Sequence, residues 1–168
     1  FSGENGMLGV VILIISLYVI IGVLEYACAF QTVIDAMLGS NLAKSPQGGE
    51  IMLAASMTLL TSIMGGAQDP AILTMGPIYN RVGQELNLHP YRRANLLDGF
   101  SNSLPVSIPF LSCYIFLTSQ LTTGYDFVAP LSVMEIATGM IYPICLFVIL
   151  IASILTGWGR TFEGPNGE

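Results

Sequence analysis

The chain has 168 residues, of which 53% are hydrophobic and only 10% are charged, and its mean hydropathy is +0.71. Soluble domains carry about 25% charged residues, so this composition is typical of a membrane protein. The formal net charge is −6 and the few basic residues form no extended patch. A nucleic-acid-binding protein needs such a basic surface, so we expect no nucleic-acid partner.

The first predicted element is an apolar segment over 8–29, in which Glu25 is the only charge. Because roughly 20 apolar residues suffice to cross a bilayer core, this segment predicts a transmembrane helix. It lacks the basic N-terminal region of a signal peptide and is longer than the usual apolar core of one. We interpret Glu25 as a rim or structural charge. Since the chain begins at Phe1, close to this segment, we expect it to be part of a longer protein.

Apolar and polar stretches then alternate along the chain. They are a connection over 31–50, an apolar unit over 51–79, a polar loop over 80–93, an apolar unit over 94–121, a connection over 122–140 and an apolar run over 141–158. The pattern predicts an all-α, polytopic helical membrane protein with about four spans. We expect a transmembrane domain over 1–158 and a cytoplasmic tail over 159–168, whose end, TFEGPNGE, has the composition of a disordered segment.

The arginines predict the orientation of these spans. Arg81, Arg92 and Arg93 lie in the loop 80–93, and Arg160 follows the last apolar run. Cytoplasmic loops are enriched in Lys and Arg, so we expect the loop 80–93 and the C-terminus to be cytoplasmic. Four crossings then place the N-terminus inside as well. We expect the protein to be integral to a bacterial-type plasma (inner) membrane.

The second apolar unit is interrupted by GGAQDP, residues 65–70. Gly65 and Gly66 can adopt the left-handed conformation that ends a helix, Asp69 is a suitable N-cap, and Pro70 suits the first helical position. The sequence therefore predicts a helix stop, a short extended link and a new helix start. Within a bilayer, irregular backbone survives only where protein or a wet cavity surrounds it, so Gln68 and Asp69 become candidates for an ion- or substrate-binding site.

The third apolar unit is predicted to break at about 103–109. Pro105 and Pro109 each remove a helical hydrogen bond. Ahead of them, Asn95, Asp98 and Asn102 share one helix face, flanked by Ser101 and Ser103. Pairs of broken helices are a pointer to a midplane site in secondary transporters. We predict that one wall of this site contains Asp69 and Gln68, and that the other contains Asp98, Asn95 and Asn102 with Ser101 or Ser103.

The chemistry of these residues suits an ion exchanger. A desolvated carboxylate binds either a proton or a small hard cation, and amide, hydroxyl and backbone oxygens complete a shell for Na⁺. The alternatives to an ion-binding role are structural: Asp69 serves only as an N-cap, or Asp98 is only a charge at the membrane interface. No cofactor is expected, because Na⁺ and H⁺ are themselves the transported ions. We also expect no enzyme, because HExxH and GxSxG are absent and the two aspartates lack the contexts of intramembrane aspartyl proteases.

The blocks GGAQDPAILTMGPIYNRVG and YRRANLLDGFSNSLPVSIPF resemble the later part of NhaC-type sodium/proton antiporters. The most specific piece is RANLLDGF, from Arg93 to Phe100, followed by the proline-broken helix. Family members are about twice as long and contain two halves of inverted topology. The resemblance implies a C-terminal half that needs the missing N-terminal half or a second copy, with a homodimer possible. The family's Gly-Asp-His type of site is absent here, because His89 is far from Asp69 along the chain.

Three functions therefore remain open. The first is exchange of Na⁺ for H⁺, which the lack of Lys or Arg within the spans favours. The second is ion-coupled exchange of a dicarboxylate or amino acid, as in relatives that exchange malate for lactate or arginine for ornithine. The third is a membrane subunit that transports nothing.

Overall fold

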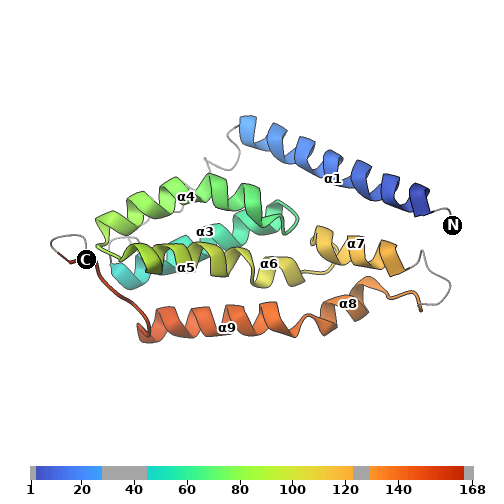
Figure 1. Cartoon of the computed structure of the whole chain (residues 1–168). Coiled ribbons are helices and arrows are strands. Elements are labelled where there is room, and N and C mark those ends of the chain that lie inside the picture. Colours follow the sequence, from blue (N-terminus) through green and yellow to red (C-terminus); the bar gives the residue numbers. More distant parts are fainter. Residues whose placement is uncertain (1–2, 28–44, 123–128, 165–168) are drawn as a thin grey trace.

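The computed structural model describes residues 3–27, 45–122 and 129–164, and this part of the chain is mostly helical, with no named strand (Figure 1). The prediction of an all-α fold is therefore confirmed for these residues. The helices are α1 (Gly3–Tyr26), α3 (Pro46–Ile63), α4 (Gln68–Glu85), α5 (Pro90–Ser101), α6 (Leu104–Ser107), α7 (Cys113–Thr122), α8 (Val133–Gly139) and α9 (Ile141–Thr156).

Helices α3 and α4 form an antiparallel hairpin (Figure 1). The Tyr79 hydroxyl near the end of α4 donates a hydrogen bond to the Leu53 carbonyl near the start of α3, at 2.7 Å. The chain therefore turns back at the predicted break, and the prediction that the two halves of the unit 51–79 continue in one direction is wrong. Helix α3 also begins earlier than predicted, at Pro46, with the Ser45 side chain as its N-cap.

A Schellman motif explains this reversal. Gly65 and Gly66 have φ values of +67° and +79°, and their N–H groups donate to the Ser62 carbonyl at 3.1 Å and the Thr61 carbonyl at 2.8 Å. Successive left-handed residues close the helix end and turn the chain sharply. The predicted extended link is a single residue: Ala67 is extended, with φ of −69° and ψ of 105°, and α4 begins at Gln68.

The predicted cap of the second half of this unit is also wrong. The N-cap of α4 is Ala67, which makes no side-chain capping bond. Asp69 and Pro70 lie in the first turn instead, where a carboxylate is favoured by the helix dipole and proline is tolerated.

The predicted break in the third apolar unit is present. Helix α5 ends at Ser101, α6 is only four residues long, and α7 begins at Cys113. Pro105 occupies the first turn of α6, where its missing N–H costs no helical hydrogen bond. The predicted loop 80–93 is shorter than expected, since α4 continues to Glu85 and α5 begins at Pro90.

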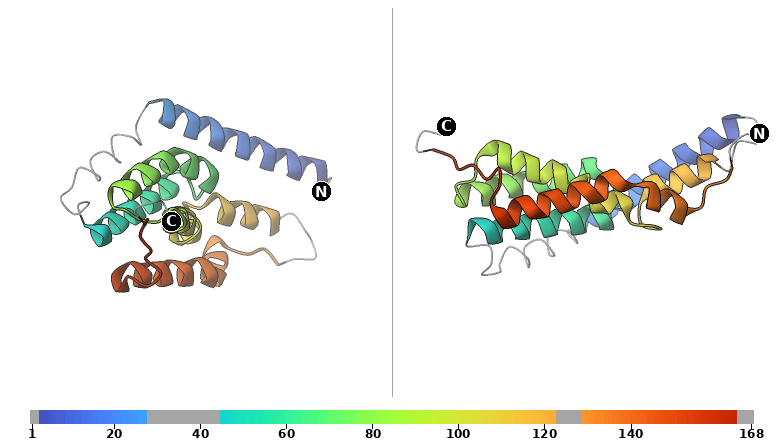
Figure 2. Two further views of the ribbon diagram at one scale, coloured as in Figure 1. Left: turned by 60° about the vertical axis from the view of Figure 1, so that its left-hand side comes forward. Right: turned by 90° about the horizontal axis from the view of Figure 1, so that it is seen from below.

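The core lies between the α3–α4 hairpin, α5 and α9. Figures 1 and 2 show α5 between the hairpin and α9, and large side chains from all four helices are fully buried there, including Leu53, Met57, Met75, Tyr79, Leu96, Phe100 and Ile154. Gly99 allows α5 to approach α9 closely, because a Cβ atom there would lie 2.7 Å from Leu150 Cδ1. These four helices form one packed bundle.

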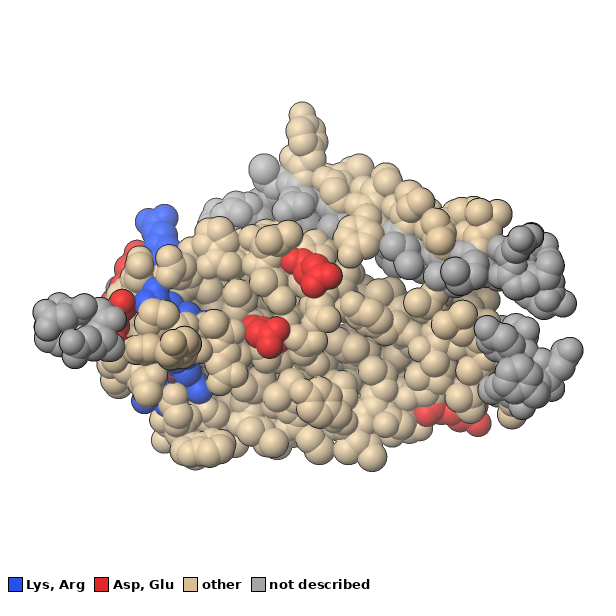
Figure 3. Space-filling model, viewed as in Figure 1, with Lys and Arg blue, Asp and Glu red and all other residues tan. Residues whose placement is uncertain are grey.

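The charged residues gather at one end of this bundle. In Figure 3 the basic atoms lie at the end where α4 stops and α5 starts, and most of the remaining visible surface is uncharged. The segment after α9 is bound here: the His89 N–H donates to the Thr161 carbonyl at 3.0 Å, and the Glu163 N–H donates to the Asn87 carbonyl at 2.8 Å. Residues 161–163 are therefore ordered, contrary to the expectation of a disordered tail, and the remainder of the predicted tail, 165–168, lies outside the described residues.

Among the residues that the structure describes, none of the helices taken singly has both the length and the apolar character needed to cross a bilayer. Helices α8 and α9 meet these requirements as a pair, by length and composition, with a bend of 50° at the break between them.

Candidate functional site

The tip of the α3–α4 hairpin packs directly against the break between α6 and α7. The Cys113 N–H, at the start of α7, donates to the Gly65 carbonyl at 2.8 Å. A Cβ atom at Gly66 would lie 3.5 Å from the Pro105 carbonyl oxygen and 3.6 Å from Ser112 Oγ. The two helix breaks predicted from sequence therefore meet, and we call this meeting point (residues 61–68 and 105–113) the junction.

Buried oxygen atoms without a protein partner are concentrated at the junction. Within the described part of the chain, six buried side-chain N or O atoms lack a hydrogen-bond partner, and five of them are oxygens at or within one turn of the junction: Thr58 Oγ1, Thr61 Oγ1, Gln68 Oε1, Ser107 Oγ and Ser112 Oγ. Thr61 is 0% exposed, Ser112 is 1% exposed and Ser107 is 6% exposed. An unsatisfied buried polar group costs about 1–3 kcal/mol, so a concentration of them requires an explanation.

Three helix ends add partial charges to the junction. Helix α3 ends there, which places its C-terminal carbonyl groups and their partial negative charge at this point. Helices α4 and α7 begin there, which brings N–H groups with partial positive charge. Carbonyl and hydroxyl oxygens are the ligands of hard cations, whereas helix N-termini suit anions.

The first predicted wall of the site lies at the edge of the junction. Gln68 is the first residue of α4, and its side chain is hydrogen-bonded to Tyr114 on α7. Asp69 follows it, close enough to Tyr114 to interact with it electrostatically, and its side chain is exposed. Gln68 and Asp69 therefore lie beside the partnerless oxygens, and the Asp69 carboxylate is at the surface.

The second predicted wall does not form a buried cavity. Asp98 and Asn95 are exposed. Asn102 Nδ2 donates to Asp98 Oδ1 at 3.0 Å, and Ser101 Oγ donates to the Asp98 carbonyl at 2.7 Å. Ser103 Oγ is buried and donates to the Phe100 carbonyl at 2.9 Å. These side chains bind the C-terminal end of α5, and none of the described contacts joins Asp98 to Asp69.

The prediction from sequence missed Thr61, Ser107 and Ser112. The glycines and prolines located the two breaks correctly, and these hydroxyl residues lie within a few positions of them. Their closeness in sequence to the breaks is the feature by which they could have been predicted. Of the residues described, no three His, Cys, Asp or Glu side chains are grouped as metal ligands would be, so the junction is distinguished by hydroxyl, amide and backbone oxygens.

Comparison with known proteins gives no assignment: no family model matches the chain, and neither a curated protein nor a solved structure gives a significant match.

Proposed function

We propose that this protein is a helical membrane protein that acts as a secondary active transporter and exchanges Na⁺ for H⁺ at the junction. The observation that carries this proposal is the set of partnerless oxygens where the hairpin tip meets the α6–α7 break, four within the junction and that of Thr58 one turn away. Their chemistry suits a small hard cation, and broken helices at such a point are typical of transporter ion sites.

The surface of the molecule supports a membrane location. Large apolar side chains are exposed along α1, α7 and α9, including Ile12, Val19, Phe116, Val148 and Leu155. Soluble monomers rarely expose continuous apolar surface on this scale. The basic side chains gather at one end (Figure 3), as expected where a bundle emerges on the cytoplasmic side.

The hairpin changes the proposed topology. The α3–α4 hairpin enters and leaves at the charged end, so we propose that it is re-entrant and crosses nothing. The three crossings are α1, from the apolar character of its sequence, the series α5–α7, and the bent pair α8–α9. The series α5–α7 and the pair α8–α9 each run between the two ends of the molecule (Figure 1). The charged end, with the α4–α5 loop and the segment after α9, is cytoplasmic in this arrangement.

The carboxylate nearest the junction has a defined role in this proposal. Asp69 lies in the first turn of α4, beside Gln68 and Tyr114. When deprotonated it adds a full negative charge to the oxygen ligands, and when protonated it does not, so H⁺ and Na⁺ compete. An ionisable side chain in a membrane faces other protein or a wet cavity, so Asp69 and Asp98 mark the face toward the rest of the transporter, which is either the missing half or a second copy.

A second candidate rests on the helix N-termini. The N–H ends of α4 and α7 meet at the junction, and such ends suit the carboxylate of an organic substrate. Ion-coupled exchange of a dicarboxylate or amino acid is therefore the alternative, as the resemblance to the NhaC-type family also allows.

Proton movement in vesicles tests the proposal. The full-length protein is reconstituted, and a Na⁺ gradient is imposed while the internal pH is recorded. We expect Na⁺-dependent proton efflux that falls at least about tenfold in Asp69→Asn, because the loss of the titratable charge removes the competition. Glu85→Gln, an exposed carboxylate on the same helix, is the control and should retain wild-type flux. Wild-type flux in Asp69→Asn would refute this site, and acceleration only by an organic acid would favour the alternative.

A further inference from the structure

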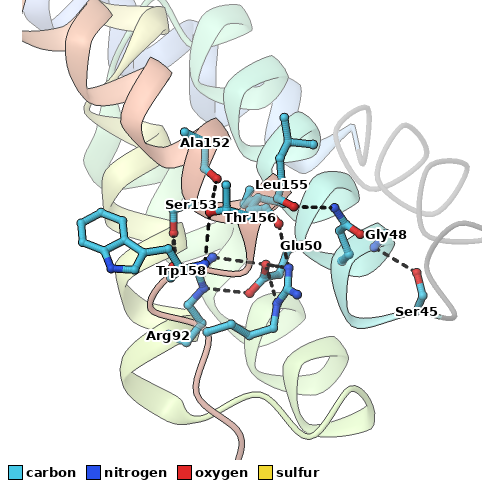
Figure 4. Close-up of polar contacts among 12 residues, drawn as sticks. Ser45, Gly48, Glu50, Arg92, Ala152, Ser153, Leu155, Thr156 and Trp158 are labelled. Atoms are coloured by element: carbon cyan, nitrogen blue, oxygen red, sulfur yellow. Dashed lines mark hydrogen bonds and ion pairs between the residues drawn. The ribbon is translucent and has the colours of Figure 1, made fainter.

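A buried ion-pair cluster joins three elements at the charged end (Figure 4). Glu50, in the first turns of α3, is 0% exposed. Arg92 of α5 donates from Nε to Glu50 Oε1 at 2.7 Å, and Arg160, which follows α9, donates from Nη2 to Glu50 Oε2 at 2.7 Å. The two arginines also bind the end of α9: Arg92 Nη1 donates to Ser153 Oγ at 2.8 Å, and Arg160 Nη2 donates to the Ile154 carbonyl at 2.9 Å.

The segment 157–163, which we call the strap, crosses the start of α5. Gly157 ends α9 in the left-handed conformation, with φ of +74°, and so redirects the chain toward the α4–α5 loop. There the strap makes an isolated antiparallel bridge between Leu88 and Phe162. Glu163 Oε2 accepts a hydrogen bond from Arg93 Nη2 at 2.8 Å. The strap therefore binds the hairpin, the loop and α5 together.

The opposite end of the hairpin is held to its neighbours by uncharged groups, without an ion pair among the described residues. At the tip, the Cys113 N–H donates to the Gly65 carbonyl, and the Gln68 side chain is hydrogen-bonded to Tyr114. The Thr61 and Ser112 hydroxyls there lack a partner among the described residues. A buried cluster of ion pairs that joins several elements rigidifies a structure, whereas a segment held to its neighbours by few hydrogen bonds opens locally at lower free energy.

We infer that the strap is a lock that fixes the charged end of the α3–α4 hairpin, so that the hairpin opens from its tip at the junction. Arg160 is the locking residue, because it is the strap side chain that reaches Glu50. Releasing Arg160 leaves a buried carboxylate with one partner in place of two, which loosens the start of α3. This inference concerns the mechanics of the fold and holds whether or not the junction binds Na⁺.

Amide hydrogen exchange on the full-length protein tests this lock without any transport assay. In the wild type, amides at the tip (61–68) should exchange at least about tenfold faster than those in the first half of α3 (50–56), because local openings start at the tip. In Arg160→Ala, exchange over 50–56 should rise at least about tenfold, while exchange at the tip changes little. Glu163→Gln weakens the pair between the strap and Arg93. It should also raise exchange over 50–56, by less than Arg160→Ala does.

Arg81→Ala is the matched control. Arg81 lies at the same end of the molecule but pairs with Glu85 at 3.5 Å in full exposure, with side chains 84% and 67% exposed. Its removal should leave exchange over 50–56 at the wild-type rate. The lock is refuted if residues 50–56 exchange as fast as the tip in the wild type, or if Arg160→Ala and Glu163→Gln both leave them unchanged.

Discussion

The most consequential single residue for stability is Glu50, a carboxylate that the sequence places in a connection and the structure buries completely. Two guanidinium groups bind it, and their side chains are 2% and 15% exposed. Burial of a charge is unfavourable unless its partners are retained, and removing one member of such a group is strongly destabilising.

Replacing Glu50 therefore gives a residue-scale prediction. Glu50→Gln should lower the free energy of unfolding by about 3–5 kcal/mol, because Arg92 is left buried without its counter-charge. Glu85→Gln removes an exposed carboxylate that pairs with Arg81. This variant should change the free energy of unfolding by about 0–1 kcal/mol. Denaturant titration of the purified protein measures both values. Equal, small losses in the two variants would show that the Glu50 cluster contributes little.

At the scale of the element, the hairpin is the feature that most changes the topology. Four crossings would place residue 47 and residue 84 on opposite sides of the membrane, whereas a re-entrant hairpin places them on the same side. Gln47 and Gln84 are both exposed near the charged end, and Leu131 is exposed between α7 and α8 at the other end.

Single cysteines at positions 47, 84 and 131 distinguish the two topologies. In a background with the native cysteines replaced by serine, a thiol reagent that cannot cross the membrane should label positions 47 and 84 from one side and position 131 from the other. This follows because α3 and α4 return to the same end of the bundle. Labelling of position 47 together with 131, and apart from 84, would restore the four-crossing topology.

The hairpin also shows which parts of the fold can be predicted from local residue preferences and which cannot. Gly65, Gly66 and Pro105 identified both breaks, because glycine at positive φ and proline without an N–H act through their own backbone. The direction of the chain after a break depends on how the next helix packs, and here the Schellman bonds of Gly65 and Gly66 and the contact between Tyr79 and Leu53 decide it. Local signals could not supply that contact.

The candidate site was predictable to a similar extent. Gln68 and Asp69 were identified at the hairpin tip, but the partnerless hydroxyls of Thr61 and Ser112 become visible only when residues about fifty positions apart meet. Asp98, Asn102 and Ser101 share a helix face as predicted, yet they bind one another at the end of α5. The buried arginines were missed for the same reason, since Glu50 lies 42 positions from Arg92.

The molecule as a whole is a bundle with two different ends. At the charged end, buried ion pairs and the strap fix the α3–α4 hairpin to α5 and α9. At the junction, two helix breaks bring together oxygens that lack protein partners. This arrangement is compatible with the proposed ion exchange, in which the ion binds and leaves at the junction while the ion pairs hold the rest of the bundle together.

Whether the junction binds Na⁺ is measured by equilibrium binding of Na⁺ to the purified full-length protein. We expect saturable binding whose affinity falls at least about tenfold in Thr61→Val and in Ser112→Ala, because each loses an oxygen ligand. Thr118→Val should bind as the wild type does, since the Thr118 hydroxyl is exposed on α7 and donates to the Tyr114 carbonyl. Unchanged Na⁺ affinity in both junction variants, or no saturable binding in the wild type, would contradict Na⁺ binding at the junction.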